Sequence, residues 1–254
     1  MIIKNEKERA NLIEAGKHLA SVMEVLKRKV APGINAEELD DLAEQLIRDE
    51  GDSPAFLGYT PEGAYLPYPA TLCVSINDEI VHGIPNESEK ILKEGDIVGL
   101  DFGLEHNGVI VDAAITVPVG NVSEESKKLL HATENALAAG IMAAIPGNHM
   151  GDISNAIQKE IEKAGFKVVK DLGGHGVGDF VHEEPFIPNF GRAGTGILLK
   201  EGMVLALEPI SAAGKSAVTL APDGYTFRTK DGSRSAHFEH TILIEKNEAR
   251  IITE

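Results

Sequence analysis

The sequence predicts an α+β fold built from two related halves, and three observations support this. Residues 5–29 and 36–50, and again 123–144 and 152–164, carry apolar residues at the spacing of amphipathic helices. The segments between and after these helix pairs are rich in β-branched and aromatic residues and are bounded by Gly and Pro. Similar segments also recur in the same order in both halves. The order helix pair, strands, helix pair, strands predicts a curved, mostly antiparallel sheet with four helices on one face.

Matching segments relate the two halves to each other. The pairs are VAPG at 30–33 with AIPG at 144–147, VHGIP at 81–85 with VHEEP at 181–185, LKEGDIVGLD at 92–101 with LKEGMVLALE at 199–208 and, more weakly, the strand from Asp112 with the strand from Glu239. The second and third pairs place His82 on His182 and Asp101 on Glu208. Convergent turn residues are the alternative explanation. Several matches in register favour two halves around a pseudo-two-fold axis, with the chemistry where they meet.

Composition narrows the class of protein. The chain has 254 residues, 43% of them hydrophobic and 25% charged, so we expect one domain over residues 1–254 with halves of roughly 1–120 and 121–254. The net charge of −16 disfavours nucleic-acid binding. A single cysteine, no apolar leader and no apolar run of bilayer length predict a cytoplasmic protein without membrane association. We expect a monomer.

Four carboxylates occur in strand segments that are expected to be buried. Asp101 and Glu208 end apolar strands, Asp112 lies inside one, and Glu239 opens another. Buried carboxylates that lie close together need a cation, because their mutual repulsion and the loss of hydration oppose ionisation. Salt bridges are the alternative, but the predicted strands contain no Lys or Arg. A divalent metal ion is therefore the better compensator.

A histidine in a glycine-rich run extends this candidate site. His175 lies in GGHGVG at 173–178, where the flanking glycines allow close backbone approach. No βα unit accompanies the run, so it does not indicate a nucleotide-binding loop. Four carboxylates and one imidazole suit two bridged divalent ions, which activate water and polarise a scissile carbonyl. The sequence thus predicts metal-assisted hydrolysis, and it contains no GxSxG motif that would indicate a serine nucleophile.

Six other histidines receive no role: His18, His106, His131, His149, His237 and His240. We expect His18 and His131 to be exposed on helices. The acidic run that contains Asp40 and Asp41 is expected to be a solvated helix face.

Four motifs together resemble the methionine aminopeptidases. They are CVSINDEIVHGIP at 73–85, GGHGVGDFVHEEP at 173–185, LEP at 207–209 and FEHTILI at 238–244. The resemblance covers essentially the whole chain. The segment from His182 to Glu208 lacks the large insertion of type II enzymes, so the chain is similar to the short bacterial type I form. The resemblance implies the pita-bread fold, whose duplicated halves agree with the repeats.

The resemblance also implies a role for each site residue. Asp112 and Glu239 would bridge two divalent ions (Co, Mn, Fe or Zn), Asp101 would bind one of them, and His175 with Glu208 the other. Glu208 would serve as general acid and base. His82 and His182 would contact the scissile peptide, and the substrate pocket would also contain Tyr68, Cys73, Val181 and Tyr225. The implied function is removal of N-terminal methionine from peptides and nascent proteins with a small second residue, with the ribosome as one place of encounter.

Three departures from the family pattern bear on specificity. Val181 stands where a large aromatic residue or Met is usual, and Ala113 stands where Thr is usual. The loop 56–69 is longer than usual, so the second pocket tyrosine could be Tyr59 or Tyr65. Two alternatives remain: an Xaa-Pro aminopeptidase or prolidase, which Val181 would suit, and a non-catalytic pita-bread binding module, which usually lacks metal ligands.

Overall fold

The computed structural model describes residues 1–61, 63 and 65–254. Its elements are α1 (Glu6–Lys29), α2 (Ala36–Asp49), β1 (Ser53–Pro54), β2 (Cys73–Ile76), β3 (Glu79–Val81), β4 (Ile97–His106), β5 (Val109–Pro118), α3 (Glu124–Ala143), α4 (Met150–Lys163), β6 (Lys167–Val168), β7 (Gly173–Gly176), β8 (Glu183–Pro188), β9 (Val204–Leu207), β10 (Ile210–Ala212), β11 (Val218–Leu220), β12 (Phe227–Thr229), β13 (Ser235–His237), β14 (Glu239–Ile244) and β15 (Ala249–Ile251).

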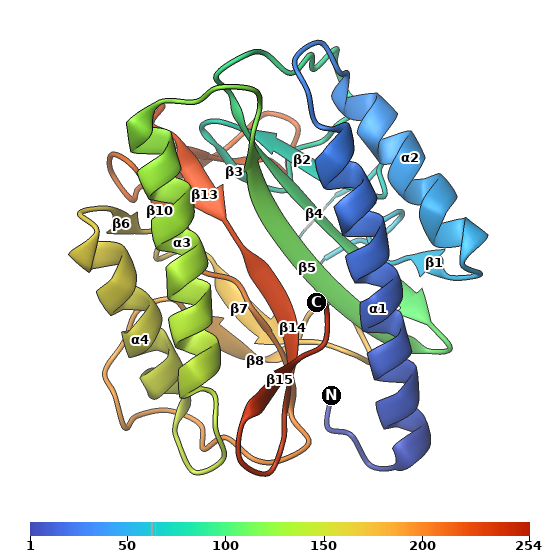
Figure 1. Ribbon diagram of the computed structural model, residues 1–254, viewed down its shortest axis with the longest axis vertical. Coiled ribbons are helices and arrows are strands. Elements are labelled where there is room, and N and C mark those ends of the chain that lie inside the picture. The colour runs from blue at the N-terminus through green and yellow to red at the C-terminus, as the bar shows by residue number, and fades with distance from the viewer. Residues whose placement is uncertain (62, 64) are drawn as a thin grey trace.

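A nine-stranded antiparallel sheet carries the fold. Its order is β1-β4-β5-β14-β9-β7-β8, with β15 beside β14 and β2 beside β4, and two three-stranded sheets accompany it. The helices α1, α2, α3 and α4 lie in front of the large sheet in the view of Figure 1. This arrangement confirms the predicted α+β class. None of the helices in the described ranges is long and apolar enough to cross a bilayer.

The two halves have matching strand pairs, and they meet where β5 pairs with β14. The pair β4–β5 corresponds to the pair β9–β14, and β5 and β14 pair with each other where the halves meet. The turns before α2 and α4 are equivalent as well. Gly33 and Gly147 have φ of 93° and 91°, and their N–H groups donate to the carbonyls of Leu92 and Leu199. The duplication read from the sequence is therefore present in the backbone.

Local chemistry explains where the helices begin. Asn35 caps α2, and Glu38 returns the reciprocal bond of a capping box. Ser123 caps α3 by accepting the N–H of Ser126. Helix α4 begins at Met150, two residues before the predicted start, because the Asp152 carboxylate accepts the N–H of His149 and so belongs to the first turn.

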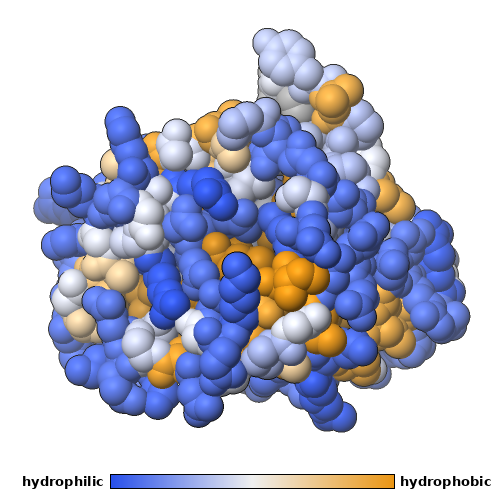
Figure 2. All heavy atoms as spheres, turned by 90° about the horizontal axis from the view of Figure 1, so that it is seen from above, coloured by the Kyte–Doolittle hydropathy of each residue, from blue (hydrophilic) through white to orange (hydrophobic). Residues whose placement is uncertain are grey.

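The core contains two large clusters, each covered by one helix pair. In the first half, α1 and α2 bury residues such as Leu12 and Leu39 in a cluster that includes Leu100 and Phe102 of β4. In the second, α3 and α4 bury a separate cluster against β9 and β14. Each fully buried leucine stabilises the fold by roughly 1.5–3 kcal/mol. The face shown in Figure 2 is mostly hydrophilic, with hydrophobic side chains gathered in its middle.

Asp40 corrects the expectation that its acidic run is a solvated face. Its side chain is buried, and Oδ1 accepts the N–H groups of Thr71 and Leu72, both at 2.8 Å. The carboxylate thereby ties α2 to the segment that enters β2. Burial raises the pKa of Asp40 to about 6, although the two N–H donors act in the opposite direction. The neighbouring Asp41 is exposed as expected.

Replacing Asp40 with Ala is expected to lower the free energy of unfolding by about 2–3 kcal/mol, because two buried N–H groups lose their acceptor. Asp40→Asn keeps an oxygen acceptor and should cost less. Since the folded-state pKa lies above the unfolded value, the contribution of Asp40 falls as pH rises from about 4 to about 6. Urea unfolding should therefore show that the free energy of unfolding of the wild type falls relative to that of Asp40→Asn as pH rises over that range.

The exposed neighbour provides the control. Asp41→Asn and Asp41→Ala should change the free energy of unfolding by less than about 0.5 kcal/mol. A similar loss in the free energy of unfolding at positions 40 and 41 would contradict the role of Asp40 in joining α2 to the segment before β2.

Candidate metal centre

All five predicted metal ligands line one cavity. Its lining consists of Phe56, Tyr59, Pro61, Tyr68, Cys73, Val81, His82, Asp101, Asp112, His175, His182, Glu208, Tyr225, His237 and Glu239. Lys and Arg are absent from this lining. The cavity therefore gathers acidic side chains, neutral imidazoles and aromatic rings, with no cation from the protein to balance the carboxylates.

The pairing register of β4, β5 and β14 places the predicted ligands Asp101 and Glu239 near each other. Asp101 of β4 and Glu239 of β14 both lie opposite Ala114 of β5, one on each side of it. Asp112 is two residues from Ala114 along β5 and so shares its face, because side chains alternate along a strand. Leu100 and Phe102, which flank Asp101, point to the opposite face and join the core with α1.

The remaining predicted ligands, His175 and Glu208, lie on the same face of the sheet, and their positions follow from the pairing of β9. His175 of β7 lies opposite Ala206 of β9, which in turn lies opposite Thr241 of β14. Glu208 is two residues beyond Ala206, so the same alternation brings it to the cavity. The site thus draws Asp101 and Asp112 from the first half and the other three ligands from the second.

Several oxygen atoms of this cluster lack a protein partner. His175 Nε2 lies 3.6 Å from Glu208 Oε1 and 3.9 Å from Glu239 Oε1. Ligand atoms of Asp112, His175 and Glu239 lie within 4.8 Å of one another. Within the described ranges, Asp101 Oδ1, Asp112 Oδ1 and Glu239 Oε1 are buried without a hydrogen bond. Such oxygens are costly unless a cation binds them, so the donor set fits divalent metal ions.

Burial controls protonation in the metal-free cavity. It raises the pKa of Asp101, Glu208 and Glu239 well above their usual values, with neighbouring carboxylates adding to the effect at Asp101 and Glu239. It raises the pKa of Asp112 to about 8. A bound cation would oppose these shifts by favouring the ionised carboxylates. Burial also lowers the pKa of His175 to about 3, so its imidazole is neutral, the form that ligates a metal.

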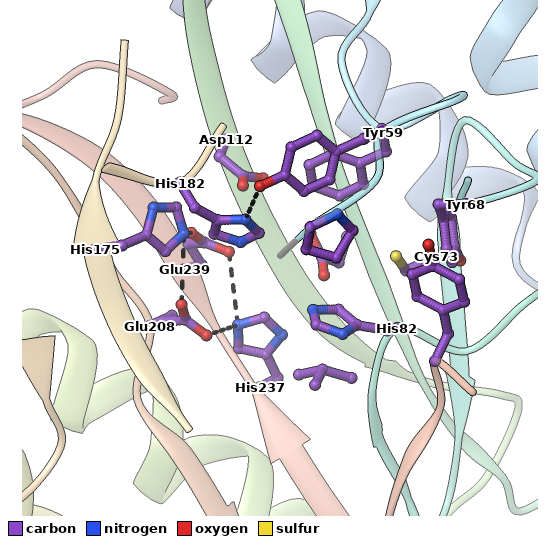
Figure 3. A pocket seen from close by; sticks show the side chains of 15 residues that line it. Tyr59, Tyr68, Cys73, His82, Asp112, His175, His182, Glu208, His237 and Glu239 are labelled. Carbon is purple, nitrogen blue, oxygen red and sulfur yellow. Dashed lines mark hydrogen bonds and ion pairs between the residues drawn. The ribbon is translucent and has the colours of Figure 1, made fainter. Parts of the chain in front are cut away.

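His237 belongs to the site although the sequence analysis gave it no role. Its Nε2 atom lies 3.4 Å from Glu208 Oε2 and 3.6 Å from Glu239 Oε2. Each of these glutamates therefore faces His175 with one oxygen and His237 with the other (Figure 3). The available signal was strand alternation: His237 precedes Glu239 by two residues and so shares its face.

His175 has a structural counterpart in the first half, Ser75, which lies outside the matching segments of the sequence. Ser75 lies opposite Gly99 in the pair β2–β4, as His175 lies opposite Ala206 in the pair β7–β9. Both stand seven residues before the equivalent cavity histidine, His82 or His182. The Ser75 hydroxyl accepts the N–H of Gly83 at 3.1 Å. The second half thus contributes an imidazole where the first has a hydroxyl, which makes the two sides of the cluster chemically different.

Two histidines lie beside the carboxylate cluster. His82 is held at a φ of 58°, in the left-handed region. His182 lies with its ring centroid 4.5 Å from that of His175, and its Nδ1 is 2.9 Å from the hydroxyl of Tyr59 (Figure 3). Burial lowers the pKa of His82 to about 4 and that of His182 below its usual value. Both imidazoles are therefore neutral near pH 7 and able to donate or accept a hydrogen bond.

The structure decides between the two tyrosines left open by the long loop. Tyr59 lines the cavity, whereas Tyr65 is fully exposed. Tyr68 and Tyr225 also line the cavity, with ring centroids 5.2 Å apart. Residues 62 and 64 of this loop lie outside the described residues.

Cys73 lines the cavity, and Val181 lies in the adjoining hydrophobic cluster. Cys73 lies opposite Asp101 in the sheet, and burial raises its pKa well above the usual value, so the thiol is protonated. The cluster that buries Val181 also contains Tyr68 and Cys73, and the next residue, His182, lines the cavity. That Val181 contributes to the substrate pocket stays a prediction.

Two related halves enclose a cluster of carboxylates and imidazoles that fits divalent metal ions, and the comparisons place the chain among the metallopeptidases. Residues 10–246 match metallopeptidase family M24, and the chain belongs to this family. Methionine aminopeptidase of Clostridium perfringens is 46% identical over 100% of this chain and 98% of its own length. Methionine aminopeptidase of Aquifex aeolicus is 44% identical over 98% of this chain and 97% of its own length. The predicted membership of a metallopeptidase family is confirmed.

Solved structures agree with the fold. The crystal structure of methionine aminopeptidase from Thermotoga maritima has a TM-score of 0.94 and 42% identity, with complete coverage of both chains. Prolidase from Pyrococcus horikoshii has a TM-score of 0.78 at 23% identity and covers 100% of this chain and 63% of its own. At that identity the prolidase shares the fold alone. The pita-bread architecture is confirmed.

Proposed function

We propose that this chain removes N-terminal methionine from peptides and nascent proteins, using two divalent metal ions. The observation that carries the proposal is the cluster of buried carboxylate oxygens that have no hydrogen bond among the described residues, in a chain whose relatives bear the name methionine aminopeptidase. The proposed ligands are Asp101, Asp112, His175, Glu208 and Glu239. Co, Mn, Fe and Zn all accept such a set, and availability decides among them.

The catalytic unit proposed here is the whole chain, residues 1–254. Asp101 and Asp112 come from the first half, and His175, Glu208 and Glu239 come from the second. Neither half alone contains the full donor set. We place the activity in the cytoplasm, with nascent chains at the ribosome among its substrates.

Divalent ions at this site would supply Lewis acidity, which polarises a carbonyl and makes water a stronger nucleophile. Glu208 would take the proton of the attacking water and deliver it to the leaving amine. Its position suits that role, because its carboxylate lies at the cavity between His175 and His237. Burial, which favours its protonated form, also makes Glu208 able to hold that proton.

His82 and His182 would position the scissile peptide. Both imidazoles are neutral and line the cavity, so each can donate one hydrogen bond to a developing negative charge on the carbonyl oxygen. The Tyr59 hydroxyl would hold the His182 ring through its contact at Nδ1. These groups exert their effect in a cavity where buried hydrogen bonds are stronger than in water.

The aromatic end of the cavity would receive the methionine side chain. Phe56, Tyr68 and Tyr225 provide apolar and aromatic surface there, beside the protonated Cys73 thiol. A thioether gains from contact with aromatic rings. The carboxylates at the other end would attract the free α-amino group of the substrate, which explains a preference for chain N-termini.

A peptide series tests this proposal. With added Mn²⁺ or Co²⁺, Met-Ala-Ser should be cleaved at least about tenfold faster than Met-Leu-Ser, with Ala-Pro-Ser left intact. A chelator should abolish cleavage, and defined metal should restore it. Exclusive cleavage of the Xaa-Pro peptide would instead establish the prolidase-like alternative. A protein that binds no divalent metal and cleaves none of the peptides would be a binding module.

A further inference from the structure

A second cluster of ligand atoms lies outside the cavity. The Asp52 carboxylate contacts two imidazoles: Oδ2 is 2.7 Å from His18 Nδ1, and Oδ1 is 2.7 Å from His106 Nδ1. The two rings are nearly perpendicular, with an interplanar angle of 88° and centroids 5.0 Å apart. Within the described ranges, this is one of two groups whose ligand atoms all lie within 4.8 Å of one another, the other being in the cavity. His18, expected to be exposed, is thus half-buried in a cluster.

The outer nitrogen of each imidazole also has a partner. His18 Nε2 lies 3.5 Å from Glu14 Oε1 and 3.9 Å from Glu50 Oε2. His106 Nε2 lies 2.8 Å from Asn107 Nδ2 and can accept its N–H. Metal-ligating histidines usually hold their second N–H with a carboxylate or carbonyl oxygen, as Glu14 and Glu50 offer to His18. The orientation of the His18 ring toward Asp52 is therefore supported from outside the cluster.

The cluster is compact enough for an ion and open enough for one to enter. Tetrahedral zinc holds nitrogen and oxygen ligands at about 2.0–2.2 Å, which separates neighbouring ligand atoms by about 3.3 Å. The 2.7 Å contacts would have to open by about 0.6 Å. The side chains of His18 and His106 are 16% and 17% exposed, and that of Asp52 is 1% exposed. Solvent can therefore reach the imidazoles and supply a fourth ligand.

The cluster joins three parts of the first half. His18 lies on α1, Asp52 lies between α2 and β1, and His106 ends β4. His106 is five residues beyond Asp101 on β4, a separation of about 17 Å along a strand. An ion here would cross-link α1 to the segment after α2 and to the end of β4 without sharing any ligand with the cavity.

We propose that His18, Asp52 and His106 form a second metal site, which takes a borderline divalent cation such as Zn²⁺ and stabilises the first half. Two imidazoles and one carboxylate are ligands that zinc accepts. Glu14 and Glu50 add negative charge beside the site, which favours a cation further. The site is structural in role, and its existence does not depend on the activity proposed above.

Zinc binding by the whole chain tests the proposal. After dialysis against micromolar Zn²⁺, the wild type should retain one more equivalent of zinc per chain than His106→Gln, by elemental analysis. Saturating Zn²⁺ should raise the Tm of the wild type by roughly 5 °C more than that of His106→Gln. In imidazole nitrogen NMR spectra of the wild type, Zn²⁺ should shift the Nδ1 resonances of His18 and His106.

Two further variants keep the test decisive. His131→Gln, the same substitution at an exposed position on α3, should retain the full zinc content and Tm response. If His106→Gln does not fold, Asp52→Asn replaces it, because the amide keeps the shape and one oxygen acceptor. Equal zinc content in wild type and variants, or unshifted His18 and His106 resonances, would show that the cluster is hydrogen-bonded only and overturn the proposal.

Discussion

Replacing Glu208 with Gln is expected to lower kcat for Met-Ala-Ser by about 1000-fold, with a much smaller change in KM. The amide has the shape of the carboxylate but cannot carry the proton from the attacking water to the leaving amine, a function worth about 100- to 10,000-fold. Steady-state kinetics at saturating metal would measure the loss. Because Glu208 is also a proposed ligand, metal content should be determined on the same sample, so that proton transfer and metal loss are separated.

A matched variant defines the baseline for this result. Glu201→Gln makes the same change at an exposed residue of the turn before β9 and should leave kcat unaltered. If Glu208→Gln retained more than about a tenth of the wild-type kcat, the acid–base role of Glu208 would be refuted.

Replacing Asp112 with Asn should reduce metal affinity by about 100-fold or more and activity to near the detection limit. Within the described part of the chain, Asp112 has a buried oxygen without a hydrogen bond, and its ligand atom lies within 4.8 Å of those of His175 and Glu239. A neutral amide is a weaker ligand for a divalent cation. Titration calorimetry with Mn²⁺ and peptide cleavage would measure the two losses.

In the presence of a chelator, Asp112→Asn should make the protein more stable than the wild type. Without metal, the wild-type chain must hold four crowded, buried carboxyl groups, and burial raises the pKa of Asp112 to about 8. The amide removes one of these groups, so the metal-free variant should unfold at a higher urea concentration than the metal-free wild type at pH 7. Asp49→Asn, at the exposed end of α2, should change neither property. A less stable metal-free Asp112→Asn protein would indicate that Asp112 is held by the protein and not by an ion.

Sequence reasoning was most successful where a residue's neighbours along the chain determine its environment. A carboxylate at the end of an apolar strand is carried into the interior by that strand, so Asp101 and Glu208 could be identified one strand at a time. The caps Asn35 and Ser123 are local in the same sense, because each bonds to N–H groups within the next three residues. The repeats then related the strands to one another, since equivalent segments of two halves meet about one axis.

The failures have a common physical cause. Asp40 lies in an acidic helical run that looks solvated, yet its partners are backbone groups some thirty residues away. The cluster of His18, Asp52 and His106 depends on contacts between distant segments, which no local pattern encodes, whereas strand alternation from Glu239 did indicate the face on which His237 lies.

By itself, the sequence determined the class of fold and the duplication, and it predicted five acidic and imidazole residues that line one cavity, because alternation and burial along each strand are local properties. Only the tertiary structure decided how those donors meet: the register of β4, β5 and β14 places Asp101 and Glu239 on either side of Ala114. It also places Tyr59 at the cavity and leaves Tyr65 exposed, and it brings His237 beside Glu208 and Glu239. These outcomes depend on strand register and loop path, which are set by the packing of the whole chain.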